Sequence, residues 1–227
     1  MRGASQFKLV YFFAMLYICL IISSSLMGQK IVATSWGVIS GASLICPFWF
    51  LLNDIVAEVY GFKITAYFFI SAIIMEFVFA LVTLLVINLP SPQGLDQQSL
   101  FVIFSPLLKV YVLQSIGVSL AWYANTYIIT RWKVLVKGKY FWLRSIGSSC
   151  VGVVIFCLVS VVPSLILVAA VNDFQDIIVM LIWSFALKMI VLTFFVYPAG
   201  LVVSLIKSVE QFDCYDNANG FNPFKDV

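Results

Sequence analysis

The sequence of 227 residues contains no histidine and few charged residues. Charged residues make up 10% of the chain, hydrophobic residues make up 63%, and the mean hydropathy is +1.09. A soluble globule of this size needs more polar surface than that, so the composition indicates a polytopic membrane protein. The lack of histidine removes imidazole bases and the commonest metal ligand, so we expect no metal ion or other cofactor.

Motifs of nucleotide hydrolysis and covalent catalysis are also lacking. The chain has no P-loop, no G-x-S-x-G and no H-E-x-x-H pattern. Its five cysteines are scattered, and four of them lie inside apolar runs. We interpret them as small buried hydrophobic residues, not as disulfide partners or metal ligands. We therefore predict that the protein is not an enzyme, and we expect no nucleic acid among its partners.

Six stretches are long and apolar enough to cross a hydrocarbon core of about 30 Å, which takes about 20 residues of helix. They cover residues 9–27, 31–53, 64–88, 110–130, 145–171 and 177–206. A turn-rich segment at 89–98 leads into an apolar piece, up to Pro106, that we expect to dip into the membrane interface. We predict an all-α membrane protein with a single six-helix domain over 1–206 and a mobile, polar cytoplasmic tail over 207–227.

Lysine and arginine residues gather beside one set of ends of these spans. With both termini in the cytoplasm, ten of the thirteen lie on the cytoplasmic side, as the positive-inside rule requires. The ten are Arg2, Lys8, Lys63, Arg131, Lys133, Lys137, Lys139, Arg144, Lys207 and Lys225. Lys30 and Lys109 fall on the opposite side, and Lys188 falls within the last span.

Two carboxylates, Asp54 and Glu58, follow directly after more than twenty uncharged residues. Residues four apart share one face of a helix, so these two side chains are expected to project together at the edge of the bilayer. Pro47 is expected to kink the helix towards a polar interior, and Gly61 to end it. The alternative is that both acids only mark the end of a membrane helix in water.

Glu76 and Lys188 are predicted near the middle of the bilayer, in the third and sixth spans. An ionisable group at this depth costs at least about 2.5 kcal/mol, so it normally has a partner and is a candidate functional group. The two residues approach from opposite sides and are predicted to form an intramembrane ion pair. Lys188 is alternatively a cation that lines a polar cavity and contacts a substrate.

Polar and aromatic residues elsewhere in the spans are weaker candidates. Asn125 in the fourth span either joins two helices by a hydrogen bond or binds the substrate. Gln29 ends a polar strip at the end of the first span. Trp36, with Phe48 and Trp49, is placed to stack on a planar ligand, although most of the aromatic residues must face lipid.

The run from Phe50 to Gly61, FLLNDIVAEVYG, resembles the signature of the queuosine precursor transporter family, six-helix proteins that are also grouped as vitamin uptake transporters. The likeness extends along most of the chain, through Ser24, Ser25, Gln29, Lys30, Trp36, Gly37, Pro47, Lys109, the run 141–143, Lys188 and Pro198. Two departures concern polar residues. Asn125 stands where the family commonly has Asp, and Val153 and Phe156 stand where it has an amide and an Asp.

The resemblance implies uptake of 7-deazaguanine bases, such as queuine and the pre-queuosine bases, across a bacterial inner membrane for tRNA modification. Carboxylates accept the paired N–H donors of a guanine-like edge, and aromatic rings stack on the base. Asp54 and Glu58 are expected to bind the edge and an aminomethyl cation, with Lys188 on the base carbonyl. The expected substrate-binding residues are Asp54, Glu58, Lys188, Gln29, Asn125 and Trp36.

Three modes of action remain open at this point. The first is a secondary carrier or facilitator that works alone, as a monomer or a homodimer. The second is a substrate-capture subunit similar to the membrane components of energy-coupling-factor importers, which dock on a separate ATPase. A membrane enzyme or scaffold is the third.

Overall fold

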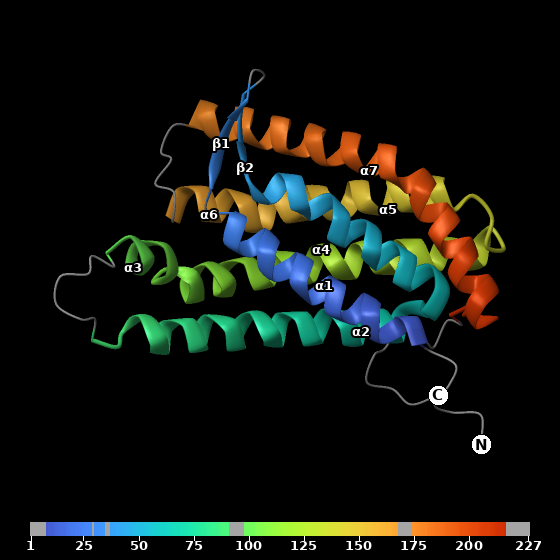
Figure 1. Cartoon of the computed structure of the whole chain (residues 1–227). Helices are drawn as coiled ribbons and strands as arrows, with labels where there is room; N and C mark the ends of the chain where they lie inside the picture. The colour runs from blue at the N-terminus through green and yellow to red at the C-terminus, as the bar shows by residue number, and fades with distance from the viewer. Residues whose placement is uncertain (1–7, 29, 35–36, 91–97, 168–173, 217–227) are drawn as a thin grey trace.

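The computed structural model of the chain describes residues 8–28, 30–34, 37–90, 98–167 and 174–216. Long helices lie side by side in a bundle, with a short β-hairpin at one end (Figure 1). The elements are α1 (Lys8–Met27), β1 (Ile31–Thr34), β2 (Gly37–Ser40), α2 (Ala42–Ile87), α3 (Gln98–Phe104), α4 (Leu107–Leu135), α5 (Phe141–Phe156), the π-helical turn η1 (Cys157–Val161), α6 (Val162–Leu167) and α7 (Phe174–Glu210). Five helical stretches in this part of the chain are long and apolar enough to cross a membrane.

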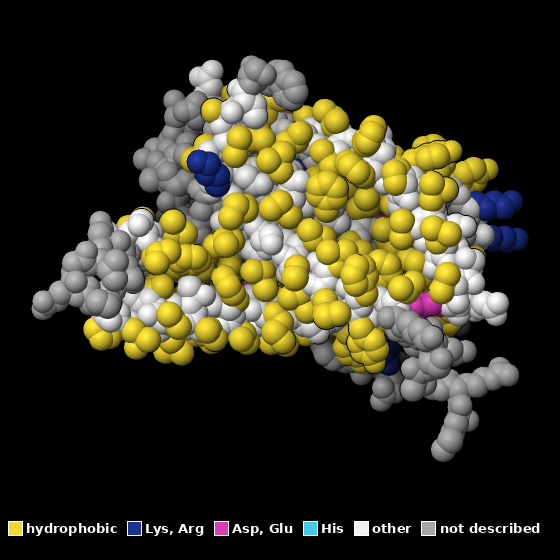
Figure 2. Space-filling view, viewed as in Figure 1, with side chains coloured by type: hydrophobic (Ala, Val, Ile, Leu, Met, Phe, Trp, Pro, Cys, Tyr) yellow, Lys and Arg dark blue, Asp and Glu magenta, His cyan; other side chains and the backbone are white. Residues whose placement is uncertain are grey.

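The flank of the bundle that faces the viewer is covered by hydrophobic side chains, and lysine and arginine appear towards its ends (Figure 2). Many large apolar residues on the outside of the bundle are strongly exposed, for example Leu85, Phe194 and Tyr197. A contiguous apolar surface of this extent is unfavourable in water and is expected where helices face lipid.

α2 consists of two helical segments joined at Gly61. The backbone of Gly61 has φ 83° and ψ −179°, a conformation that glycine adopts without the steric penalty of a side chain. A straight helix of 46 residues would measure about 69 Å, more than twice the hydrocarbon thickness. The chain instead turns back here, so that the two segments lie along the same bundle (Figure 1). The prediction that Gly61 ends the helix carrying the two acids is confirmed.

The prediction of a helix over 31–53 is wrong at 31–34 and 37–40, which are strands. β1 and β2 pair in antiparallel register, from Ile31 opposite Ser40 to Thr34 opposite Gly37, and α2 begins only at Ala42. Hydropathy does not separate a short apolar strand from a helix, and β-branched residues are frequent in this stretch. Pro47 therefore lies in the second turn of α2, and the interruption of regular helical geometry is at Gly61.

The last two predicted spans also differ from the structure at their ends. The fifth is divided into α5, η1 and α6, and its predicted final residues, 168–171, lie outside the described part of the chain. α7 extends through Lys207 to Glu210, so the predicted tail begins as helix. Residues 211–216 then pack against the bundle and are not detached from it, while 217–227 lie outside the description.

The first segment of α2 is the centre of the bundle. Every residue from Trp49 to Phe62 is buried, and α2 packs against α1, α4, α5 and α7. A helix that is buried on all sides must bury its polar residues together with its apolar ones. This central position is what brings Asp54 and Glu58 into the interior of the protein.

Candidate functional site

Asp54 is fully buried at the contact between α2, α4 and α5. The Asn125 amide donates to Asp54 Oδ1 at 2.6 Å, and the hydroxyls of Ser145 and Ser149 donate to Oδ2 at 2.6 and 3.1 Å. Within the described residues no cation forms an ion pair with this carboxylate. We call Asp54, Asn125, Ser145 and Ser149 the Asp54 cluster. Its three donors to the Asp54 carboxylate are all neutral.

Close packing of α5 makes these hydrogen bonds possible. A Cβ atom at Gly152 would lie 2.8 Å from Phe50 Cε1, 3.1 Å from Asn125 Cβ and 3.2 Å from the Ala121 carbonyl oxygen. Only a residue without a side chain fits between these helices at that separation. Gly152 therefore sets the approach of α5 to the two helices that carry Asp54 and Asn125.

One acceptor of the Asp54 cluster is left without a donor. Asn125 Oδ1 is buried, and no hydrogen bond reaches it from any residue that the structure describes. Most buried polar atoms in proteins are hydrogen-bonded, so an exception beside a buried carboxylate is a candidate ligand-binding atom. Carboxylate and amide oxygens together form an acceptor pair suited to a molecule with N–H donors.

Glu58 lies one helical turn beyond Asp54 and has cationic partners. Arg144 Nη1 donates to its Oε2 at 2.7 Å, and Lys207 Nζ donates to its Oε1 at 2.9 Å. Lys133 Nζ donates to the backbone carbonyl of Glu58 at 2.5 Å. Glu58, Arg144 and Lys133 are each 2% exposed. We call Glu58, Arg144, Lys133 and Lys207 the Glu58 cluster.

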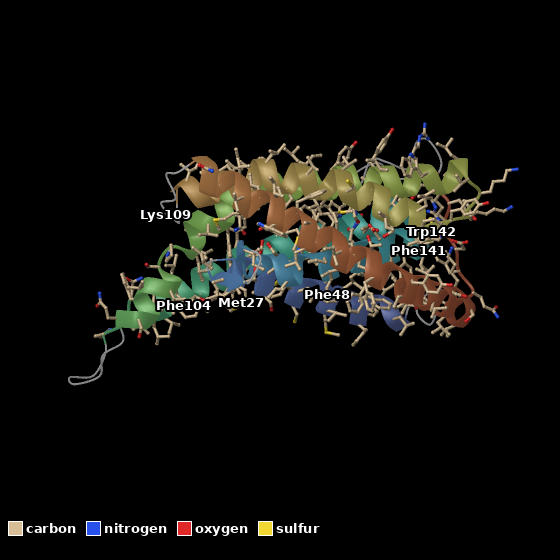
Figure 3. All side chains as sticks on the ribbon, turned by 90° about the horizontal axis from the view of Figure 1, so that it is seen from above. Met27, Phe48, Phe104, Lys109, Phe141 and Trp142 are labelled. Carbon is tan, nitrogen blue, oxygen red and sulfur yellow. The ribbon has the colours of Figure 1, made fainter. Side chains whose placement is uncertain are left out.

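Asp54 and Glu58 do share one face of α2, as their spacing predicts. Their partners Ser145 and Arg144 are adjacent residues near the start of α5, at the end of the bundle where Figure 3 labels Phe141 and Trp142. The alternative, in which the two acids mark a helix end in water, does not hold because the side chains are 0% and 2% exposed.

Lys188 does not join either cluster. Its ammonium lies 4.7 Å from the centre of the Phe156 ring and 3.7 Å from Cys157 Sγ, and the residue is 1% exposed. Cys157 follows Ser149 by eight residues, which corresponds to about 12 Å along a helix. Lys188 is thus a buried cation that faces an aromatic ring, and it lies at a different depth in the bundle from Asp54.

The predicted ion pair between Glu76 and Lys188 is absent from the described part of the structure. Glu76 is 4% exposed and accepts a hydrogen bond from the Ser25 hydroxyl of α1, whereas Lys188 faces Phe156 on α5. The prediction matched the two residues by depth alone. Depth does not determine on which face of the bundle a side chain lies, so residues at similar depth need not meet.

The remaining predicted candidates have mixed outcomes. Gln29 and Trp36 lie outside the described residues. Trp49 stacks on Phe50 with ring centres 4.1 Å apart, both rings are buried, and Phe50 lies beside Asn125 of the Asp54 cluster at Gly152. Phe48 is instead 37% exposed and contacts Phe195 on α7, away from the cluster.

Sequence reasoning missed Ser145 and Ser149 as ligands, and assigned Arg144 and Lys133 only to a charged cytoplasmic loop. The four-residue spacing of Ser145 and Ser149 equals that of Asp54 and Glu58, so it was a signal for a polar face on α5. The charged residues carried no comparable signal. Their burial follows from helix ends that converge on Glu58, and this convergence is not visible in local sequence.

The apolar flanks, the long helices and the buried polar centre together define a multi-pass membrane protein. A buried carboxylate with neutral donors, an unpaired amide oxygen and adjacent aromatic rings can bind a small polar molecule away from lipid. The arrangement is a candidate site for a small polar solute inside a membrane protein.

Residues 40–202 match the family model described as putative vitamin uptake transporter. The chain therefore belongs to the vitamin uptake transporter family, and the resemblance drawn from the sequence is confirmed at this level. Membership implies a small-molecule substrate and a transport function, which is not enzymatic. No significant match was found among curated proteins or among solved structures.

Proposed function

We propose that this protein imports 7-deazaguanine bases, such as queuine and the pre-queuosine bases, across a bacterial inner membrane for tRNA modification. The observation that carries the proposal is the Asp54 cluster, which combines a buried carboxylate with an unpaired amide oxygen. A guanine-like edge presents neighbouring N–H donors, and a carboxylate can accept two of them in parallel. In this proposal Asp54 exchanges its serine hydrogen bonds for those of the base.

The rings of Trp49 and Phe50 support a planar substrate. A Cβ atom at Gly152 would contact both Phe50 and Asn125, so one ring of the stacked pair lies beside the residue whose amide oxygen is unpaired. A flat heterocycle can stack on a ring while its edge is hydrogen-bonded, as bases do in single-stranded nucleic acid sites. Trp49 and Phe50 take the stacking role that the sequence suggested for Trp36, Phe48 and Trp49.

Glu58 is assigned to the aminomethyl cation of a pre-queuosine base. Both of its carboxylate oxygens are already bonded, so the substrate cation would replace Lys207, which is 24% exposed, and not the buried Arg144. Lys188 is assigned to a separate position on the substrate path, because its contact Cys157, at the start of η1, lies roughly 12 Å along the helix from Ser149. The base bound at Asp54 is not expected to reach Lys188 at the same time.

We infer six membrane crossings, with both termini in the cytoplasm. The two segments of α2 count as separate crossings because the chain turns back at Gly61. The Glu58 cluster and the α4–α5 connection place most basic residues at one end, while Lys109 lies at the other end (Figure 3). The positive-inside rule then assigns the end with Phe141 and Trp142 to the cytoplasm.

The test is uptake of radiolabelled queuine and pre-queuosine base by cells that lack their own transporter and synthesis and express this chain alone. We expect uptake by the wild type. In a separate measurement of equilibrium binding of the same labelled bases, we expect Asp54→Asn to lower the affinity about 10- to 100-fold, because one charge-assisted contact to the base is lost. Glu76→Gln is the matched control, since it neutralises another buried carboxylate outside the Asp54 cluster. Binding by this control should remain near wild type.

The possible failures have separate meanings. Binding without uptake by the isolated chain would favour a capture subunit that needs an ATPase partner. Absence of both, with confirmed membrane insertion, would overturn the deazaguanine assignment. Equal loss of binding in Asp54→Asn and Glu76→Gln would remove the assignment of Asp54 as the base-binding residue.

A further inference from the structure

The segment after α7, residues 212–216, docks on the interruption of α2. The Cys214 amide donates to the Val59 carbonyl at 3.0 Å, and the Phe62 amide donates to Asp216 Oδ2 at 2.9 Å. The break at Gly61 leaves backbone groups of both helical segments without helical partners. The docked segment supplies partners to a carbonyl on one side of the break and an amide on the other.

Lys133 of α4 is the main side-chain contact of this docked segment. Its ammonium donates to Asp213 Oδ1 and to the Cys214 carbonyl at 2.5 Å each, and it lies 4.5 Å from the centre of the Tyr215 ring. The same ammonium donates to the Glu58 carbonyl. A single buried lysine thus connects the docked segment to the residue at the centre of the Glu58 cluster.

A second cation makes the same connection. Lys207 Nζ lies 2.9 Å from Glu58 Oε1 and 3.0 Å from Asp213 Oδ1, so it joins the two carboxylates. Phe212 stacks on Tyr60 with ring centres 6.3 Å apart. Burial raises the pKa of the Asp216 carboxyl, and the Phe62 amide and Lys133 act in the opposite direction. The docked segment is therefore packed into this end of the bundle by both charged and aromatic contacts.

The position of the docked segment relative to the site suggests what it does. It contacts the cations that hold Glu58, and Asp54 lies one helical turn deeper in the bundle. A carrier must open its site to one side of the membrane at a time, and such sites are commonly closed by loops or segments at an element's end. The docked segment also lies outside the family match over 40–202.

We propose that residues 212–216 are a latch that closes this end of the bundle over Glu58, and that leaves before the Asp54 cluster can be reached from that side. The proposal rests on the proposed transport function. Asp213 is the residue that releases the latch, since it is 34% exposed while its partner Lys133 is 2% exposed. A substrate cation that takes Glu58 from Lys207 would weaken the Lys207 contact to Asp213 at the same time.

Cys214 provides a direct readout in the full-length chain. The experiment measures how fast a membrane-impermeant maleimide labels Cys214 in inside-out vesicles, with labelling followed by mass spectrometry of the C-terminal peptide. We expect Asp213→Asn and Lys133→Gln to raise the rate about three- to tenfold, the range for losing one partly exposed, hydrogen-bonded ion pair. Lys139→Gln is the matched control, because it removes a charge from an exposed side chain of the α4–α5 connection, outside the Glu58 cluster.

A second variant tests whether the latch covers the site. Ser145→Cys places a thiol in the Asp54 cluster, and adding Asp213→Asn in the same full-length chain should increase its labelling from the same side at least about threefold. Equal Cys214 rates in Asp213→Asn, Lys133→Gln and Lys139→Gln would overturn the proposal. An unchanged Ser145→Cys rate in the presence of Asp213→Asn would also overturn it. Neither measurement uses substrate, so failure here is distinguishable from failure of the transport assignment, which the uptake experiment tests.

Discussion

Asp54 and Glu58 lie one turn apart on the same face of α2, yet their carboxylates have different partners. Asp54 is bound by an amide and two hydroxyls, and Glu58 by an arginine and a lysine. The difference follows from depth. Glu58 is reached by basic residues near the ends of α5 and α7, whereas Asp54, one turn deeper, is reached by Ser145, Ser149 and Asn125. In the proposed function Asp54 exchanges its serine hydrogen bonds with the ligand, whereas Glu58 keeps the buried Arg144 and exchanges only Lys207.

The largest effect is expected for Glu58→Gln. This change leaves Arg144 buried without its carboxylate, and an uncompensated buried charge costs about 3–5 kcal/mol. The free energy of unfolding, measured by denaturant titration in mixed micelles, should fall by that amount. The double variant Glu58→Gln with Arg144→Gln should recover part of the loss. Purely additive effects of the two changes would contradict the assigned ion pair.

Gly152→Ala probes the packing beneath the Asp54 cluster and should have an intermediate effect. The new methyl group would press on Phe50, Asn125 and the Ala121 carbonyl, and overpacking of this kind costs about 1–3 kcal/mol. The matched control is Gly200→Ala, whose nearest neighbour would be Phe141 Cδ1 at 3.7 Å, an ordinary contact. The two thermal unfolding midpoints should differ clearly, and equal midpoints would mean that α5 is free to move away.

Lys188→Met is expected to have the smallest effect on stability, and the opposite sign. Within the described residues Lys188 has no carboxylate partner, so methionine removes the cost of a buried cation and retains its volume. The free energy of unfolding should rise by about 1 kcal/mol, although the contact to Phe156 is lost. A fall of that size would show that Lys188 has a stabilising partner. Loss of uptake in a variant that remains stable would place Lys188 on the substrate path.

The membrane-spanning character and the break at Gly61 could be predicted because they depend on local properties. A long apolar run predicts a membrane-spanning helix, and a glycine after a helical pattern predicts the end of the helix, whatever the rest of the chain does. The paired strands at 31–34 and 37–40 could not be separated from a helix, because both are apolar and the pairing of strands is a contact between segments. The predicted ion pair of Glu76 and Lys188 failed for a related reason, since sequence indicates depth but not the direction of a side chain.

The sequence by itself determined that this chain belongs in a membrane and that Asp54 and Glu58 share one helix face, because hydropathy and helical periodicity act locally. Only the tertiary structure decided which partners each acid has. Ser145 and Arg144 are adjacent in the chain, but they contact different carboxylates because α5 crosses α2 at the separation that Gly152 permits. The docking of residues 212–216 was likewise decided by the fold, since the backbone groups exposed at Gly61 and the lysines that hold Asp213 come from distant parts of the chain.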